Sequence, residues 1–197
     1  MSLVDHKHPF ELFEKWFGDA KCREADVPEA MSLSSVSPDG KPSSRMVLLK
    51  GVDERGFVFY TNCTSRKGQQ IQGNSHVALL FHWKSLKRQV RIEGQAVPVT
   101  EAEADAYFAS RHKDSRIGAW ASKQSQPMEG RFEFEKRIAK YAAKYTLGDV
   151  PRPEFWSGFR IKPTMIEFWQ DRSFRLHERN VYSLQDDGQW EVSTLYP

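Results

Sequence analysis

Short strand-like segments joined by tight turns fill the first half of the chain, and they constrain the possible folds more than any other feature. Two of the turns carry strong signals, Pro38-Asp39-Gly40 and Asp53-Glu54-Arg55-Gly56. The strands that we predict around and after these turns cover residues 31–37, 43–50, 57–61, 77–82 and 88–97. Consecutive strands with tight connections pair in the antiparallel sense. We therefore expect an antiparallel sheet that closes toward a barrel.

Helices and further strands are predicted around this sheet. Aromatic residues at helical spacing predict a first helix, Ser65 can cap a second, and Thr100 with Glu103 forms a capping box for a third. The predicted helices cover residues 9–21, 65–73, 100–111, 115–122 and 131–145. Strands are predicted again over residues 158–161, 165–170, 174–182 and 190–195. The pattern indicates one α+β domain over residues 1–197, with residues 1–8 as a disordered tail.

Composition and cysteine content narrow the class of protein. The chain has 29 Lys and Arg against 26 Asp and Glu, a net charge of +3, which is too small an excess to indicate nucleic-acid binding. The two cysteines, Cys22 and Cys63, give no disulfide framework. The sequence contains neither a signal-peptide pattern nor an apolar run of membrane-spanning length. We expect a soluble cytoplasmic protein with no membrane contact.

Residues 166–179 form the segment most indicative of function. If residues 175–179 are extended, Arg175, His177 and Arg179 share one face, because side chains alternate along a strand. Two fixed cations beside an imidazole make a poor core and a good anion site. The preceding Phe168-Trp169 pair can supply a flat apolar wall. A planar anionic small molecule is the ligand class that this pattern predicts.

Three other groups of cations could bind anions. Arg45 and Lys50 are five residues apart, so a regular strand sends them to opposite faces. Ser65-Arg66-Lys67 lies at a predicted helix start, where free backbone N–H groups favour phosphate. Tyr107 and Arg111 share a helix face, with Ser115 beyond a possible break at His112–Asp114. Each group alone could equally be surface charge.

Several common motifs of nucleotide-binding, hydrolytic and zinc sites are absent from the sequence. We find no G-x-G-x-x-G fingerprint, no P-loop and no G-x-S-x-G elbow. The six histidines form no H-E-x-x-H, and the cysteines form no zinc pattern, so no metal site is expected. These absences disfavour dinucleotide-binding Rossmann domains, P-loop ATPases and α/β-hydrolases.

Taken together, these segments resemble the pyridoxine (pyridoxamine) 5′-phosphate oxidase family, from about Phe10 to Pro197. The most specific match is Ile166-Glu167-Phe168-Trp169-Gln170, followed by Arg175-Leu176-His177-Glu178-Arg179. Other matches, in order, are the Arg45–Lys50 strand, Phe59-Tyr60-Thr61-Asn62, Ser65-Arg66-Lys67, Arg88-Gln89-Val90, Ile117-Gly118-Ala119-Trp120 and Ser122-Lys123-Gln124-Ser125. The resemblance implies an α+β fold built on an antiparallel split β-barrel with flanking helices. It also implies a homodimer that binds FMN at the subunit interface.

The resemblance also implies roles for individual residues. The flavin site would be lined by Arg45, Met46, Val47, Leu48, Leu49, Lys50, Tyr60, Thr61, Arg66, Lys67, Gln89, Gln124, Ser125, Trp169 and Arg179. The substrate would contact Lys50, Tyr107, Arg111, Ser115, Arg175, Leu176 and His177, with Arg175 and His177 as the catalytic pair. The implied reaction transfers a hydride from substrate C4′ to flavin N5. Dioxygen then reoxidises the flavin and yields H2O2, and the product is pyridoxal 5′-phosphate.

The chain departs from the family pattern at few points. Glu178 stands where aspartate is common, and nothing before Phe10 matches the basic, tyrosine-containing segment that covers the substrate in many members. Three other functions are compatible with parts of the pattern. They are another split-barrel flavoprotein, such as a flavin reductase or an oxidase of a different phosphorylated heterocycle, a non-catalytic carrier or sensor of pyridoxal phosphate, and a nucleic-acid-binding barrel.

Overall fold

The computed structural model describes residues 8–24, 26–130 and 132–197. The helices are α1 (Pro9–Arg23), α2 (Arg66–Gly73), α3 (Glu101–Ser110), α4 (Lys113–Ala121) and α5 (Glu133–Lys144), with a 3-10 turn at Ser173–Arg175. The strands are β1 (Ala30–Val36), β2 (Pro42–Leu48), β3 (Gly51–Asp53), β4 (Gly56–Asn62), β5 (His76–Trp83), β6 (Arg88–Pro98), β7 (Trp156–Gln170), β8 (Glu178–Leu184) and β9 (Trp190–Thr194). Apart from His8, the predicted disordered tail lies outside the described residues.

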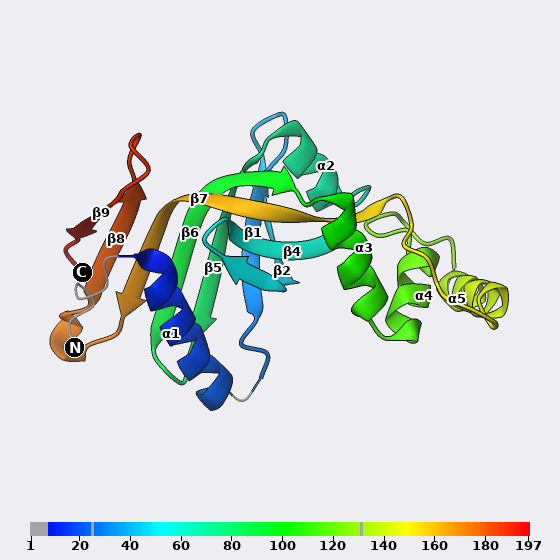
Figure 1. Ribbon diagram of the computed structural model, residues 1–197, viewed down its shortest axis with the longest axis horizontal. Helices are drawn as coiled ribbons and strands as arrows, with labels where there is room; N and C mark the ends of the chain where they lie inside the picture. Colours follow the sequence, from blue (N-terminus) through cyan, green and yellow to red (C-terminus); the bar gives the residue numbers. More distant parts are fainter. Residues whose placement is uncertain (1–7, 25, 131) are drawn as a thin grey trace.

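All the described strands belong to one antiparallel sheet. Its order is β2-β1-β5-β6-β7-β4-β3, and β8 pairs with β7 and β9 with β8. The sheet curls around α1, while α3, α4 and α5 lie beyond the N-terminal end of β7 (Figure 1). The predicted fold class, an antiparallel split barrel with flanking helices, is confirmed. None of the helices in the described part of the chain is both long and apolar enough to span a bilayer.

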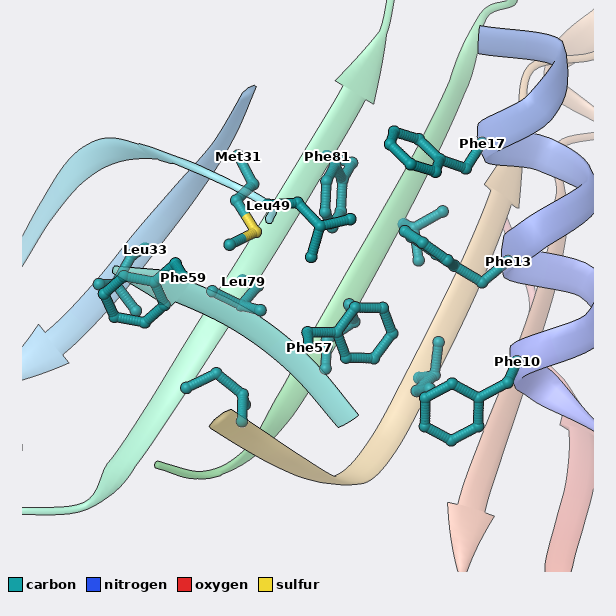
Figure 2. Close-up of a cluster of buried hydrophobic side chains, with 14 of the residues drawn as sticks. Phe10, Phe13, Phe17, Met31, Leu33, Leu49, Phe57, Phe59, Leu79 and Phe81 are labelled. Atoms are coloured by element: carbon teal, nitrogen blue, oxygen red, sulfur yellow. The ribbon is translucent and has the colours of Figure 1, made fainter. Parts of the chain in front are cut away.

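The core fills the space between the curled sheet and α1. The aromatic face of α1 predicted from spacing is buried, and Phe13 meets Phe57 edge to face, with ring centroids 4.8 Å apart. Figure 2 shows these rings against Met31, Leu79 and Phe81 from the strands. Full burial of one such side chain contributes about 1.5–3 kcal/mol. The core therefore holds rigidly the strands that carry the candidate site.

The long strand β7 corrects one prediction. Residues 158–161 and 165–170 were predicted as separate strands, but they form one 15-residue strand that includes Pro163. The register of β6 on β7 shifts between Glu93 and Gly94, so the irregular ladder accommodates the proline. A Cβ on Gly94 would collide with the backbone of Lys162 and Pro163. Glycine therefore permits the close approach that keeps β7 continuous.

Two other strand predictions are wrong at one end. The strand predicted over 43–50 ends at Leu48, and a separate short strand β3 begins at Gly51. The strand predicted over 174–182 begins only at Glu178. Phe174 and Arg175 have φ values of 57° and 61°, which belong to the left-handed region and cannot continue a strand. The chain turns at these two residues before β8.

A charged layer joins β3, β7 and α3 on the outside of the sheet. The buried Arg160 guanidinium donates to Asp53 Oδ1 at 3.0 Å and to Glu103 Oε1 at 2.8 Å. Glu103 also accepts from the backbone N–H of Thr100, and this hydrogen bond, with the nearby Arg160, lowers the pKa of Glu103. The capping box predicted from sequence is thus confirmed and is tied to the sheet.

We expect Glu103→Gln to destabilise the protein by about 1 kcal/mol at neutral pH, since Glu103 is partly exposed and its cap and ion pair are screened by solvent. A group whose pKa is lowered on folding stabilises the protein above its unfolded pKa and loses that effect as pH falls through the folded value. The difference from wild type should therefore shrink as pH falls below the ordinary glutamate value of 4.5 and disappear below the lowered folded value. Urea unfolding at pH 7 and pH 3.5 measures it, with exposed Glu54→Gln as control. An unchanged difference at both pH values would contradict this electrostatic account.

Candidate active site

A cavity of about 680 Å³ lies between the sheet and the helices α3 and α4. It brings together eleven residues that the resemblance assigned to cofactor or substrate, namely Met46, Val47, Leu48, Lys50, Tyr60, Thr61, Lys67, Tyr107, Arg111, Ser115 and Gln124. These residues come from β2, β4, α2, α3, α4 and the loop after α4. Segments far apart in the sequence therefore converge on one hollow large enough for a ring system.

Three parallel aromatic rings form one wall of this cavity. Tyr60 stacks on Tyr107 with ring centroids 4.0 Å apart and planes 13° apart, and Tyr60 lies 5.5 Å from Trp156 at 3°. Burial raises the pKa of both tyrosines, so their hydroxyls stay protonated; Tyr60 donates to the Glu103 carbonyl oxygen at 3.4 Å, and Tyr107 can donate to a ligand. A flat apolar wall with polar hydroxyl edges suits a heteroaromatic ligand.

Arg111 lies against this wall without an anionic partner in the described part of the chain. Its guanidinium carbon is 4.8 Å from the Trp156 ring centroid, and its Nη1 is buried with no hydrogen-bond acceptor. Burial lowers the pKa of Arg111, which is the direction expected of a cation removed from water. The buried unsatisfied donor and the nearby Lys50, Tyr107 and Ser115 fit an anionic group of a ligand.

A second cation group, Arg45, Arg66 and Lys67, lies at the N-terminus of α2. Ser65 caps the helix, as predicted, and its Oγ accepts from Gly68 N–H. Burial, and then the proximity of Arg66, lowers the pKa of Arg45; burial and Arg45 lower the pKa of Lys67. No carboxylate forms an ion pair within 4 Å of these cations among the described residues. Three mutually repelling cations at a helix N-terminus fit a phosphate.

Lys67 connects this second cation group to the main cavity. Its Nζ donates to Gln124 Oε1 at 3.1 Å, and Thr61 Oγ1 donates to the same oxygen at 3.4 Å. A Cβ on Gly68 would collide with the backbone of Cys63, so glycine lets α2 begin close to the end of β4. The cation group is large enough to bind one phosphate, and it lies at the edge of the cavity that the aromatic rings line.

The remaining predicted residues of the Arg45–Lys50 segment and the loop after α4 lie elsewhere. The side chain of Leu49 is buried in the core, so it can offer a ligand only its backbone. Arg45 does not line the cavity but points toward buried polar groups beside α2. Ser125 lies in a neighbouring hollow of about 290 Å³, lined by residues 121–128, 133, 134 and 137. Arg66 is exposed on the first turn of α2.

A second hollow of about 250 Å³ contains the predicted residues Gln89, Trp169 and Arg179. The buried carboxylate of Glu167 lies 2.7 Å from Arg179 Nε and 2.9 Å from Arg91 Nη2. Arg179 is therefore oriented by a carboxylate, in contrast to Arg111. Gln89 and Arg91 on β6 face outward into this hollow, while Val90 between them is buried.

Arg175, Leu176 and His177 lie in the turn before β8, close to the second hollow but outside the first. The prediction that Arg175, His177 and Arg179 share one strand face is wrong, because Phe174 and Arg175 adopt left-handed backbone angles. The His177 ring packs on Trp169 with centroids 4.9 Å apart. Its Nδ1 lies 3.0 Å from Asp171 Oδ1 and 3.2 Å from Arg172 N–H. Only a protonated Nδ1 can donate to Asp171, and only a deprotonated one can accept from Arg172.

The two hollows lie toward opposite ends of β7. Trp156 at its start lines the first, and Trp169 near its end lines the second. At about 3.3 Å per residue, a 15-residue strand runs roughly 45–50 Å along its path. Figure 1 shows α3 and α4 at one end of β7 and β8 at the other. One small ligand therefore cannot touch Trp156 and Trp169 of the same chain.

Seven residues that line the main cavity were not predicted as site residues: Asn62, His112, Gly118, Ala119, Ser122, Phe134 and Trp156. A periodic signal could have revealed some of them. Ser115, Gly118, Ala119 and Ser122 follow i, i+3, i+4, i+7 spacing, which puts small residues on one face of α4. Trp156 has no such signal, because it begins a strand whose start was not predicted.

Comparisons with known proteins agree with this geometry. A family model described as pyridoxamine 5′-phosphate oxidase matches residues 19–145, and one described as the pyridoxine 5′-phosphate oxidase C-terminal dimerisation region matches residues 156–197. A protein of Rhodospirillum rubrum named pyridoxine/pyridoxamine 5′-phosphate oxidase is 57% identical over 202 residues, covering 100% of both chains. One of the same name from Agrobacterium fabrum is 55% identical and covers 99% of this chain and 95% of its own.

Solved structures show the same fold. PhzG from Burkholderia lata, in complex with tetrahydrophenazine-1-carboxylic acid, superposes with a TM-score of 0.92 at 32% identity, covering 98% of this chain and 94% of its own. A pyridoxamine 5′-phosphate oxidase-related, FMN-binding protein from Nostoc punctiforme superposes with a TM-score of 0.80 at 17% identity, covering 100% of both chains, which supports the fold alone. On the family matches and the two relatives above 50% identity, this chain belongs to the pyridoxamine 5′-phosphate oxidase family of oxidoreductases.

Proposed function

We propose that this protein oxidises pyridoxine 5′-phosphate and pyridoxamine 5′-phosphate to pyridoxal 5′-phosphate, with FMN as cofactor, O2 as acceptor and H2O2 as by-product. The observation that carries the proposal is a pair of separate cation groups, one around Arg111 and one around Arg45 and Lys67, for which the described residues provide no carboxylate partner. Such a reaction has two phosphate monoesters to hold, one on the flavin and one on the substrate. Each is costly to desolvate unless it is paired.

The group at the α2 N-terminus suits the FMN phosphate. Arg66, Lys67 and the first turn of α2 would hold that phosphate, because a helix N-terminus and fixed cations both favour an anion there. Gln124 and Thr61 lie between this group and the aromatic wall, where amide and hydroxyl groups can hydrogen-bond to a polar ring edge. This chain's residues thus fit a phosphorylated flavin without a Rossmann turn.

The group around Arg111 suits the substrate phosphate. Lys50 and Ser115 line the cavity beside it, and Tyr107 can donate from a protonated hydroxyl. Charge-assisted hydrogen bonds contribute roughly 1.5–3 kcal/mol each, so three of them are compatible with micromolar binding. The phosphate would therefore anchor the substrate with its ring along the aromatic wall.

When bound, the flavin would accept a hydride from substrate C4′ and pass the electrons to dioxygen. The chain would contribute orientation and charge. Arg175 and His177 would hold the pyridine ring at the flavin, and His177 would assist removal of the proton from the C4′ substituent. The alternative hydrogen bonds of His177 Nδ1, to Asp171 or from Arg172, give its ring a way to be held in either protonation state.

We further propose that the active protein is a homodimer in which each site uses residues of both chains. The match to a C-terminal dimerisation region and the separation of the two hollows along β7 support this. Large apolar side chains near both hollows are exposed in one chain, notably Met46 (63%), Leu176 (68%) and Phe174 (93%). A second copy would cover such residues. We also propose that residues 1–197 form a single domain and that the protein is cytoplasmic, where its free Cys22 and Cys63 stay reduced.

The test is the visible spectrum of the purified protein during anaerobic addition of substrate. We expect a yellow protein that pyridoxine 5′-phosphate or pyridoxamine 5′-phosphate bleaches and that air restores with release of H2O2. Bleaching by a reduced nicotinamide but not by the vitamin phosphates would instead indicate a flavin reductase. Binding of pyridoxal 5′-phosphate without bleaching by either substrate would indicate a carrier. Oxidation of an unphosphorylated dihydroaromatic carboxylate alone would indicate an activity on the kind of ligand bound by the PhzG relative.

A further inference from the structure

Gln70 lies in α2 one turn after Lys67, and its side chain is buried with 4% exposure. Its Oε1 atom accepts three hydrogen bonds, from Ser35 Oγ at 2.7 Å, from Ser43 Oγ at 2.8 Å and from Arg45 Nη2 at 3.1 Å. Ser35 and Ser43 are register partners on β1 and β2. The Gln70 amide therefore links α2, whose first turn carries Arg66 and Lys67, to β2, which carries Arg45.

The guanidinium of Arg45 is held entirely by neutral acceptors. Nη1 donates to Ser35 Oγ at 2.6 Å and to the Leu33 carbonyl at 3.1 Å, and Nη2 donates to Ser43 Oγ at 2.6 Å and to Gln70. Both terminal nitrogens are thus fixed in direction, although no carboxylate in the part of the chain that the structure describes pairs with them. Burial, and then the proximity of Arg66, lowers the pKa of Arg45, as expected for a cation held by neutral acceptors.

Most other arginines in the described part of the chain are held differently. Carboxylates pair with Arg55, Arg88, Arg91, Arg116, Arg152, Arg160, Arg172 and Arg179. These pairs hold the fold together and neutralise the cation. A carboxylate at Arg45 would do the same and would reduce the attraction of the cation group for an anion. A neutral amide fixes the guanidinium without that effect.

We propose that Gln70 is a positioning residue of the cofactor-phosphate site. It holds Arg45 beside Arg66 and Lys67 by an uncharged acceptor, so the three positive charges remain available to the phosphate. Gln70 itself does not line the cavity. The inference rests on the proposed function, because it takes the phosphate of FMN as the anion.

The test separates charge from packing with three variants. Gln70→Glu keeps the size of the side chain and adds a negative charge, and Gln70→Met keeps the size and removes the acceptor. Gln72→Glu adds the same charge to an exposed position two residues along α2 and is the matched control. Apoprotein of each variant is titrated with FMN and with riboflavin, following flavin fluorescence. The ratio of the two dissociation constants reports the phosphate contribution alone.

We expect Gln70→Glu to lower the FMN preference at least about tenfold and Gln70→Met about threefold, with riboflavin affinity nearly unchanged. Gln72→Glu should stay within about twofold of wild type. An unaltered preference in Gln70→Glu overturns the inference, and so does an equal loss of FMN and riboflavin affinity, which would indicate a purely structural role. If Gln70→Glu does not fold, Gln70→Met decides by the same ratio.

Failure of FMN as the cofactor, the part of the proposed function on which this inference rests, would give a different result. Wild-type apoprotein would then bind FMN no better than riboflavin, and the present inference would fall with it. A wild-type protein that prefers FMN and oxidises pyridoxine 5′-phosphate, together with an unaltered preference in Gln70→Glu, would overturn only the role of Gln70.

Discussion

Replacing Arg111 with methionine is expected to raise KM for pyridoxine 5′-phosphate at least about 100-fold and to leave kcat within about threefold. The guanidinium is buried against Trp156 and has an unsatisfied Nη1, so it can give a phosphate two charge-assisted hydrogen bonds. Loss of two such bonds, at about 1.5–3 kcal/mol each, corresponds to two orders of magnitude or more. The phosphate is remote from C4′, so its binding contributes equally to ground state and transition state and appears in KM.

The same substitution should not destabilise the apoprotein. A buried cation without a partner opposes folding, and burial already lowers the pKa of Arg111. We therefore expect the melting temperature of the apoprotein to stay constant or rise in Arg111→Met, as is common where binding groups are preorganised at a cost in stability. Thermal unfolding without ligand, beside steady-state kinetics, measures the two effects together.

Arg152→Met is the matched control. Arg152 is as buried as a core residue but is paired with Asp105 and Glu101, and it does not line the cavity. Its replacement should lower the melting temperature and leave KM within about threefold. Arg111→Lys should fall between wild type and Arg111→Met, because lysine keeps the charge and loses the planar stack on Trp156. A wild-type preference for pyridoxine 5′-phosphate over pyridoxine in Arg111→Met would contradict phosphate binding at this residue.

At a substrate concentration far below the raised KM of Arg111→Met, mixing two impaired variants should restore about one quarter of wild-type activity if each site uses two chains. Arg111→Met removes a cation from the first hollow, and Arg175→Ala removes a cation near the second. In a randomly mixed dimer population half of the dimers carry one variant of each kind. Each of these dimers has one site with both changes and one site with neither. Subunits are exchanged in mild denaturant, and flavin reduction by pyridoxine 5′-phosphate is followed after refolding.

The structure supplies the reason to expect this recovery. Trp156 and Trp169 line different hollows and lie toward the two ends of a strand that runs roughly 45–50 Å. A mixture of Arg175→Ala with His177→Ala serves as the control, because both changes fall in the same group and no mixed dimer then has an intact site. Zero recovery in the first mixture, with subunit exchange shown by mass spectrometry, would mean that all the residues of a site come from one chain.

Local sequence patterns were sufficient for much of this fold. Alternation and turn residues predicted most strands of the antiparallel sheet, and the caps at Ser65 and Thr100 were correct, because such signals depend on a few neighbouring residues. The break between Arg111 and Ser115 was also anticipated, since α3 ends at Ser110 and α4 begins at Lys113. The family resemblance supplied the residues that converge on the main cavity.

Only the tertiary structure decided how those residues are arranged. Periodicity could not show that Phe174 and Arg175 adopt left-handed angles, which removes the shared face expected for Arg175 and His177. It could not show that Gln70 accepts from Arg45, because the two residues meet only when α2 packs beside β1 and β2. The sequence by itself determined the strands, the caps and the types of charged group. Packing decided which cations pair with a carboxylate, because pairing depends on whether a carboxylate from a distant segment comes within reach.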